Sequence, residues 1–173
     1  DFLCKPVKEA DLRAAAEKAG KLRARREPAA GNGKIISIFS NKGGNGTTTI
    51  AANLADALVR YHGKKVVVVD LVLANGDVTM FFNANPTYTI QDLAKSAGNA
   101  DYDFLHSLLV KHETGVYILA DPPMIEDAEQ ISAAQVKEVL STLRSMFDII
   151  IVDTPHQFDD KTLTALEMSD TVL

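Results

Sequence analysis

The fold follows from one segment, Ser40-Asn41-Lys42-Gly43-Gly44-Asn45-Gly46-Thr47-Thr48-Thr49. It comes after the apolar run Lys34-Ile35-Ile36-Ser37-Ile38-Phe39 and before a helical pattern that reaches about Tyr61. A strand, a glycine-rich turn and a helix form the context that a phosphate-binding loop requires. Glycines let backbone N–H groups approach a phosphate, and the start of the helix adds the positive end of its dipole. The sequence therefore predicts a nucleotide site at this turn.

The usual phosphate-binding loop reads G-x-x-x-x-G-K-[ST]. No glycine stands at its first position here, although Gly46 fills the last glycine position and Thr48 fills the Ser/Thr position. Thr47 occupies the lysine position, and a different lysine, Lys42, lies early in the loop. This order resembles the deviant loop of the ParA/MinD family, K-G-G-x-G-K-T-T. Against that pattern the segment has one loss, from lysine to Thr47.

Composition is that of a globular chain with one sizeable core. Of its 173 residues 46% are hydrophobic, and the longest apolar run is too short to cross a bilayer. The chain opens on no secretory signal pattern. A single cysteine, Cys4, excludes an internal disulfide framework and fits a reducing compartment. We therefore expect a cytoplasmic protein.

Charge is distributed unevenly along the chain. Residues 1–33 hold eight Lys or Arg and five Asp or Glu, whereas the other 140 hold ten and eighteen. An acidic main body argues against broad non-specific DNA binding, which needs clustered positive charge. The basic run over 21–26 is interpreted as a solvated helix end, with a nucleic-acid or lipid contact as the alternative.

The first 27 residues read as a unit of their own. Asp1-Phe2-Leu3-Cys4-Lys5-Pro6-Val7 is followed by an alanine-rich helical pattern to about Arg25. This order resembles the last strand and helix of a response-regulator receiver domain; an ordinary strand end and surface helix is the alternative. The resemblance makes Lys5 the lysine that contacts a phosphorylated aspartate, which would lie upstream. Residues 28–33 read as a linker, and we expect the chain to be an internal piece of a longer protein.

Over residues 34–173 the pattern alternates between strands and helices, which predicts an α/β domain with a parallel sheet, incomplete at its C-terminus. The strands are expected at about 34–40, 65–70, 116–120 and 148–153 and from 171. The helices are expected at about 47–61, 88–95, 102–111, 132–146 and 160–168. Right-handed crossovers would place the carboxyl ends of the strands, and with them the predicted site, along one edge.

Two predicted strands end in a carboxylate, Asp70 and Asp153. Mg²⁺ prefers oxygen ligands and keeps several waters, so one or two carboxylates beside a phosphate loop make a magnesium site. Asp153 looks like the aspartate of a Walker B strand. Asp148, at the start of the same strand, is expected to cap the opposite edge of the sheet.

The resemblance to ParA/MinD ATPases covers residues 34–173 and points to one branch. The family's D-x-D reads Asp70-Leu71-Val72 here, so the second acid is replaced by Val72. Asn75-Gly76-Asp77-Val78 then resembles the F-G-D-V of the CpaE/TadZ branch, which assembles Flp-type (Tad) pili. That branch carries an atypical receiver domain before the ATPase domain, which agrees with the interpretation of residues 1–27.

The resemblance implies ATP and Mg²⁺ as cofactors and assigns the site by matching positions. Lys42 would reach the phosphates of a partner in an ATP-dependent homodimer and, with Asp153, would serve catalysis. The magnesium set would be Thr48, Asp70 and Asp153. The nucleotide-binding set would be Lys42, Gly43, Gly44, Asn45, Gly46, Thr47, Thr48 and Thr49.

The lysine missing at position 47 and the acid missing at position 72 both affect the expected binding and hydrolysis of ATP. A charge-assisted hydrogen bond contributes about 1.5–3 kcal/mol, so Thr47 should weaken nucleotide binding roughly ten- to hundredfold. In the family the acid missing at Val72 helps to position the attacking water, and positioned acid–base groups contribute about 10²–10⁴-fold. We therefore expect a nucleotide-binding protein with weak or absent ATP hydrolysis.

The expected role is localisation or assembly of a Flp-type pilus secretion system, at the cell pole or at the inner membrane through protein partners, without sequence-specific nucleic-acid binding. Two alternatives stay open: a nucleotide-free scaffold and a relative that acts in chromosome partition or cell division. The histidines have no metal spacing, and only His156 lies near the site. Met80, Phe81 and Phe82 are expected in the core, with an exposed partner patch as the alternative.

Overall fold

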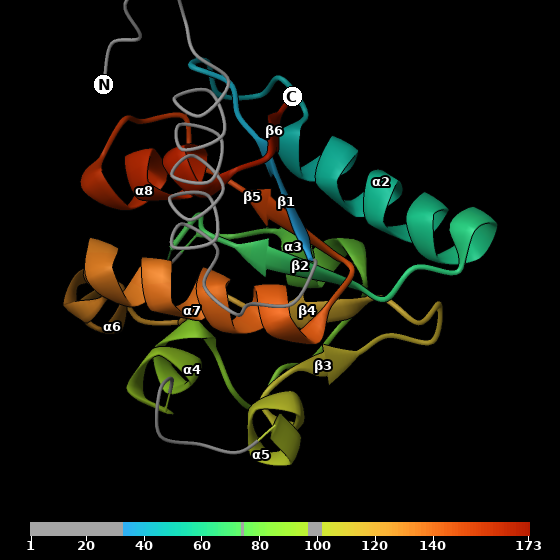
Figure 1. Cartoon of the computed structure of the whole chain (residues 1–173). Coiled ribbons are helices and arrows are strands. Elements are labelled where there is room, and N and C mark those ends of the chain that lie inside the picture. Colours follow the sequence, from blue (N-terminus) through green and yellow to red (C-terminus); the bar gives the residue numbers. More distant parts are fainter. Residues whose placement is uncertain (1–32, 74, 97–101) are drawn as a thin grey trace, which may run out of the picture. The chain divides into compact units, whose positions relative to one another are not determined.

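The computed structural model describes residues 33–73, 75–96 and 102–173 (Figure 1). The predicted receiver-like segment over 1–27 and nearly all of the predicted linker over 28–33 lie outside these residues. The elements follow in the order β1 (Lys34–Ile38), α2 (Thr47–His62), β2 (Val66–Asp70), α3 (Val78–Phe81), α4 (Ile90–Ser96), α5 (Tyr102–Ser107), β3 (Val110–Lys111), β4 (Tyr117–Leu119), α6 (Ile125–Gln130), α7 (Ala133–Met146), β5 (Ile149–Asp153), α8 (Asp160–Met168) and β6 (Thr171–Val172).

The strands form one sheet in the order β3-β4-β2-β5-β1-β6. Every pairing is parallel except that of the edge strand β3 with β4. The register pairs Ile38 with Asp153, and Asp153 in turn with Asp70. The ends of β1, β2 and β5 therefore meet at one edge, beside the turn that leads into α2.

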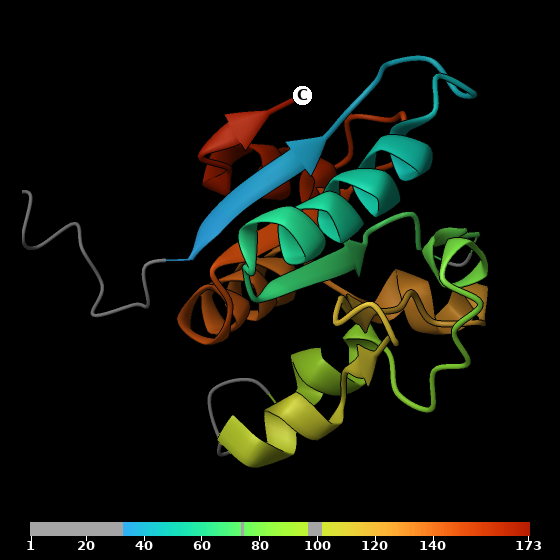
Figure 2. The ribbon, with the colours of Figure 1, turned by 90° about the vertical axis from the view of Figure 1, so that its right-hand side faces the viewer.

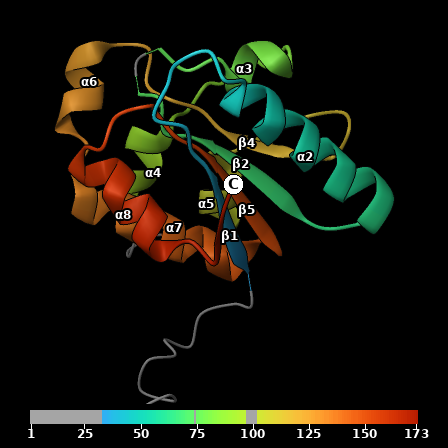
Figure 3. The same ribbon diagram turned by 90° about the horizontal axis from the view of Figure 1, so that it is seen from above.

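Helices cover both faces of the sheet (Figure 3). On one face α2 and α3 pack with Val66 and Val68 of β2. On the other face α4, α5, α7 and α8 pack with Val67 and Val69. Because successive residues of a strand point to opposite faces, an unbroken valine run suits a strand buried on both sides. The predicted α/β fold with a mostly parallel sheet is confirmed.

The edge of the sheet beyond β4 differs from the prediction. The helix expected over 102–111 ends at Ser107, and Val110 and Lys111 form β3 instead. They pair antiparallel with Ile118 and Tyr117 through a tight turn at Gly115, whose φ of 95° favours glycine. The helix expected over 102–111 is therefore wrong at its last residues, because Val110 and Lys111 take their conformation from a partner strand more than from their own pattern.

Two short helices, α3 and α6, were not predicted. α3 has four residues, too few for a helical pattern to be read in the sequence.

The Met80-Phe81-Phe82 run lies at the end of α3. Phe82 is buried, but Met80 is 76% exposed and Phe81 is 49% exposed, so the expectation of core packing fails for two of the three.

Among the described residues, no helix combines the length and apolar character needed to cross a membrane.

Candidate functional site

The turn between β1 and α2 has the backbone of an open cradle. Gly44 and Gly46 have φ values of 78° and 80°, in the left-handed region that favours glycine. Gly46 is the N-cap of α2 and no side chain caps this helix, so its first N–H groups stay available for another acceptor. A Cβ placed on Gly43 or Gly44 would meet nothing within 4 Å. The cradle is therefore open on the side where a phosphate would bind.

Ser40 holds the first half of this turn in shape. Its Oγ accepts hydrogen bonds from the Asn45 side-chain amide at 2.6 Å and from the Lys42 backbone N–H at 3.3 Å. Ser40 thereby braces the loop, a role that the sequence did not signal because the phosphate-loop pattern makes no demand on the residue that precedes it. Lys42 is exposed, and within the described part of the chain it forms no ion pair.

Thr48 and Asp153 meet directly. The Thr48 hydroxyl donates a 2.6 Å hydrogen bond to Oδ2 of Asp153. Asp153 has no exposed surface, and its other oxygen, Oδ1, accepts no hydrogen bond among the described residues. Burial raises the pKa of the Asp153 carboxyl, the hydroxyls of Thr48 and Thr47 oppose the shift, and the negative charge of Asp77 adds to it. The site thus contains a buried carboxylate oxygen that lacks a donor.

Asp70, the register partner of Asp153, has a different set of contacts. It is fully buried, and its Oδ1 and Oδ2 accept the backbone N–H groups of Val72 at 3.0 Å and Val78 at 3.2 Å. Burial raises the pKa of Asp70 to about 8; the charges of Asp121 and Asp153 add to the shift, and the two N–H groups oppose it. The carboxylate that the sequence assigned to magnesium therefore anchors the loop that follows its own strand.

That loop closes tightly over Asp70. A Cβ at Gly76 would lie 2.1 Å from Oδ2 of Asp70, so a residue without a side chain is needed there. The Gly76 N–H donates to Oδ2 of Asp121 at 3.1 Å. Gly76 and Asp121 are thus structural members of the site that sequence reasoning missed; the only signal was the glycine in Asn75-Gly76-Asp77.

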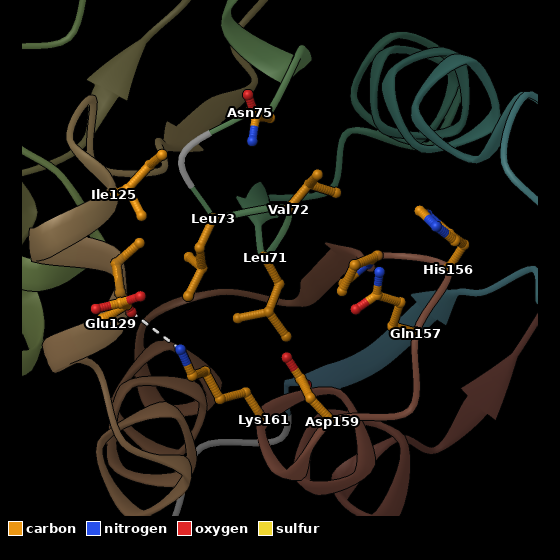
Figure 4. Close-up of a pocket in the computed structure, with 12 residues that line it drawn as sticks. Leu71, Val72, Leu73, Asn75, Ile125, Glu129, His156, Gln157, Asp159 and Lys161 are labelled. Atoms are coloured by element: carbon orange, nitrogen blue, oxygen red, sulfur yellow. Dashed lines mark hydrogen bonds between the residues drawn. The ribbon is translucent and has the colours of Figure 1, made fainter.

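A cavity of about 410 Å³ adjoins the site between the loop after β2 and the loop after β5 (Figure 4). Val72 lies on its wall with Leu71 and Leu73, so the position where the family carries an acid is apolar here. His156 lies on the opposite side, near the site as predicted, and it is exposed. Lys161 closes the far end by donating to the Ala128 carbonyl at 2.9 Å.

The other histidines lie away from this edge. His106 stacks on Tyr102 and meets Tyr117 edge-on, and burial together with the charges of Lys65 and Lys111 lowers its pKa. At the opposite edge of the sheet, Asp148 accepts the backbone N–H of Lys65 at 2.9 Å, in agreement with its predicted capping role. No cluster of three or more His, Cys, Asp or Glu suited to a metal exists among the described residues.

A protein-family model described as an AAA domain matches residues 33–173. The structure resembles a ParA family ATPase from Chlorobium tepidum, with a TM-score of 0.75 and 26% identity over 82% of this chain and 59% of the other. The chain belongs to the AAA-domain family of ParA/MinD-like P-loop ATPases.

Other members of this group agree with the assignment. An ATP-binding protein of Methanocaldococcus jannaschii is 34% identical over 78% of this chain and 49% of its own length. MinD from Pyrococcus horikoshii, solved with Mg-ADP, has a TM-score of 0.66 and 29% identity over 80% of this chain and 56% of the other. The chain spans about half the length of the curated relatives that it matches.

The residues of this ParA/MinD-like site fit a magnesium-bound nucleotide. Open glycines and an uncapped helix start suit phosphate oxygens. The Thr48 hydroxyl and Asp153 are oxygen donors of the kind that Mg²⁺ prefers, and the unpartnered Oδ1 of Asp153 suits a water bound to the metal. Bound in this cradle, Mg²⁺ would offset the charge of the phosphates.

Proposed function

We propose that this chain is a nucleotide-binding ParA/MinD-like domain that binds Mg-ATP and hydrolyses it slowly or not at all. One observation carries the proposal: the 2.6 Å contact of Thr48 with Asp153 next to an open glycine cradle. A contact of this kind between the helix start and the end of a neighbouring strand brings a magnesium ligand set to the phosphate site.

The backbone N–H groups of Gly43, Gly44 and Gly46 receive the phosphates in this proposal, with Asn45, Thr47, Thr48 and Thr49 completing the nucleotide-binding set. Thr47 is the weak point, because a hydroxyl replaces a charged ammonium. Loss of one charge-assisted hydrogen bond weakens binding roughly ten- to hundredfold. Exposed Lys42 remains as the cation of the loop, available to the phosphates of a second copy in an ATP-dependent dimer.

Hydrolysis is affected more strongly than binding. The Thr47 position lacks a cation for transition-state charge, and Val72 presents an apolar side chain to the cavity beside the site. The buried Asp70 has both oxygens on backbone N–H groups. Val72 and Asp70 are therefore not placed to orient a water molecule. This favours a nucleotide-controlled switch over a fast ATPase.

For the cellular role we propose localisation or assembly of a Flp-type (Tad) pilus secretion system. The support is the CpaE/TadZ-like sequence that follows β2, whose Gly76 is the residue that closes over Asp70. Deletion of the gene followed by electron microscopy of the cell surface tests this role. Loss of pili with normal division and chromosome segregation is expected; normal pili with a division or partition defect would favour the other ParA/MinD roles.

The competing function is a scaffold that binds partners without nucleotide, which the missing lysine at position 47 favours. Thermal unfolding with and without Mg-ATP separates the two, since a ligand that binds only the native state stabilises it. ATP at about 100 times its Kd adds about 2.7 kcal/mol, or several degrees in Tm. No shift at millimolar Mg-ATP would support the scaffold.

The first prediction concerns Thr48→Val, which removes the hydroxyl at nearly constant volume. It should abolish the Tm shift caused by Mg-ATP and weaken binding of a fluorescent ATP analogue at least tenfold. It should also lower the ligand-free stability by about 1.5–3 kcal/mol, because Asp153 loses its hydrogen bond. Thr142→Val on α7 is the matched control, expected to keep the full Tm shift. A Thr48→Val protein that keeps the shift would refute the assignment.

A further inference from the structure

We propose that Asp77 is a member of the magnesium–nucleotide site and supplies, from the far end of the loop after β2, the acidic group that is absent at position 72. This inference deepens the proposed function and rests on it. Asp77 would act on a bound Mg²⁺ through the metal's water shell, together with Asp153.

The path of the loop brings Asp77 back to the site. The backbone on both sides of residue 77 is held against Asp70: Gly76 packs on its carboxylate, and the Val78 N–H donates to it at 3.2 Å. Asp70 is in turn the register neighbour of Asp153. Residue 77 is therefore fastened beside the two strand ends, although six residues separate it from the end of β2.

The Asp77 carboxylate is not used by the fold. It stands at the N-cap of α3, where an aspartate ordinarily accepts a backbone N–H from the first turn, but its side chain makes no such bond. The residue is exposed, and within the described part of the chain its side chain has no hydrogen bond or ion pair. The neighbouring acids have structural partners, since Asp70 holds two N–H groups and Asp121 holds that of Gly76.

Asp153 brings an unused oxygen to the same strand ends. Its Oδ1 atom is buried and has no hydrogen-bond partner among the described residues. Asp77 adds a second carboxylate on the loop that is held against the neighbouring Asp70. A hydrated divalent cation is the chemical species that offsets the charge of two such carboxylates.

The arrangement of helices agrees with this placement. α3 packs against α2, and it lies beside the half of α2 that follows the glycine-rich turn (Figures 2 and 3). Asp77 precedes α3 directly, so this packing keeps its backbone near the end of the sheet at which α2 begins.

The test is the dependence of nucleotide affinity on Mg²⁺, measured with a fluorescent ATP analogue in Mg²⁺ and in EDTA. Asp77→Asn should reduce the gain in affinity that Mg²⁺ provides roughly tenfold, the lower end for a residue that acts through the water shell of a metal. In EDTA its affinity should be equal to or tighter than that of the unmodified protein, because a negative charge near the phosphates is gone. Asp77→Glu should restore much of the Mg²⁺ gain.

Asp103→Asn on α5 is the matched control, since it removes the same charge from an exposed aspartate on another helix. It should leave the Mg²⁺ gain intact, and the Tm values of all variants should agree. A full Mg²⁺ gain in Asp77→Asn overturns this inference and leaves the proposed function standing. An unmodified protein that binds no nucleotide overturns the proposed function and this inference together.

Discussion

Asp70 and Asp153 occupy paired positions on neighbouring strands, and both are fully buried. Their neighbours give them different tasks. Asp153 accepts the Thr48 hydroxyl and keeps one oxygen without a partner, whereas each oxygen of Asp70 accepts one backbone N–H. The contacts around each strand end therefore decide which carboxylate keeps an oxygen without a hydrogen-bond donor.

The raised pKa of Asp70 predicts a pH-dependent stability. Its folded pKa of about 8 exceeds the ordinary value of 3.8, so the folded state binds the proton more tightly than the unfolded state. The stabilisation that protonated Asp70 gives to the folded state is therefore fully present below pH 3.8 and is lost as the pH rises to about 8. The slope is at most about 1.4 kcal/mol per pH unit for one proton.

Asp70→Asn should flatten this slope, because a neutral amide replaces the group that titrates. Urea denaturation between pH 5 and 8 measures it, and Asp148→Asn on the same sheet is a control for the loss of a single capping carboxylate. An unchanged slope in Asp70→Asn would show that Asp70 is ionised throughout this range.

A further prediction at the residue scale restores the missing cation. Thr47→Lys should tighten nucleotide binding by about tenfold or more, the contribution of one charge-assisted hydrogen bond. Turnover measured by phosphate release should stay low, because position 72 remains apolar. Asn53→Lys, which adds the same charge later on α2, is the control and should not change affinity. Fast turnover in Thr47→Lys would contradict the role given to Val72.

At the scale of elements, the loop over residues 71–77 connects the site to α3. Its two ends are tied to Asp70, its glycine packs on that carboxylate, and α3 begins immediately afterwards with Met80 and Phe81 exposed. A change at the site that moves this loop would therefore move an exposed apolar surface as well.

Gly76→Ala tests how tightly this loop is packed. The new Cβ would fall 2.1 Å from a buried carboxylate oxygen, so the loop or Asp70 must shift. We expect a loss of about 1–3 kcal/mol, typical of overpacking, seen as a lower urea midpoint. Gly43→Ala is the matched control: its Cβ meets nothing within 4 Å, so stability should be unchanged while nucleotide binding weakens. Equal urea midpoints for Gly76→Ala and Gly43→Ala would show that the loop can shift without a loss of stability.

At the scale of the whole molecule, the sequence was sufficient for the α/β class and for the edge at which the site forms. The runs Ile35–Ile38, Val66–Val69 and Ile149–Val152 are short and rich in β-branched residues, which favours buried strands, and a glycine-rich turn between a strand and a helix has few alternatives. Strong local patterns of this kind survive in any tertiary context, because burial and backbone geometry favour the same conformation.

Other features depended on contacts between distant residues. Val110 and Lys111 are a strand because Ile118 and Tyr117 lie opposite them. The four-residue helix α3 begins where the chain has already returned to Asp70. No local pattern encodes such pairings, since a segment of two to four residues has too little intrinsic preference to resist its surroundings.

The Lys42–Thr49 turn shows both what the sequence determines and what only the tertiary structure determines. Its glycines, its hydroxyls and the substitution at Thr47 are legible in the sequence, and they were enough to predict a phosphate cradle with a weakened cation. Which carboxylate oxygens beside that cradle lack a hydrogen-bond donor was decided by the tertiary structure, because it depends on which oxygens the surrounding backbone already occupies. Asp70 accepts two N–H groups, while Asp153 keeps a buried oxygen without a donor.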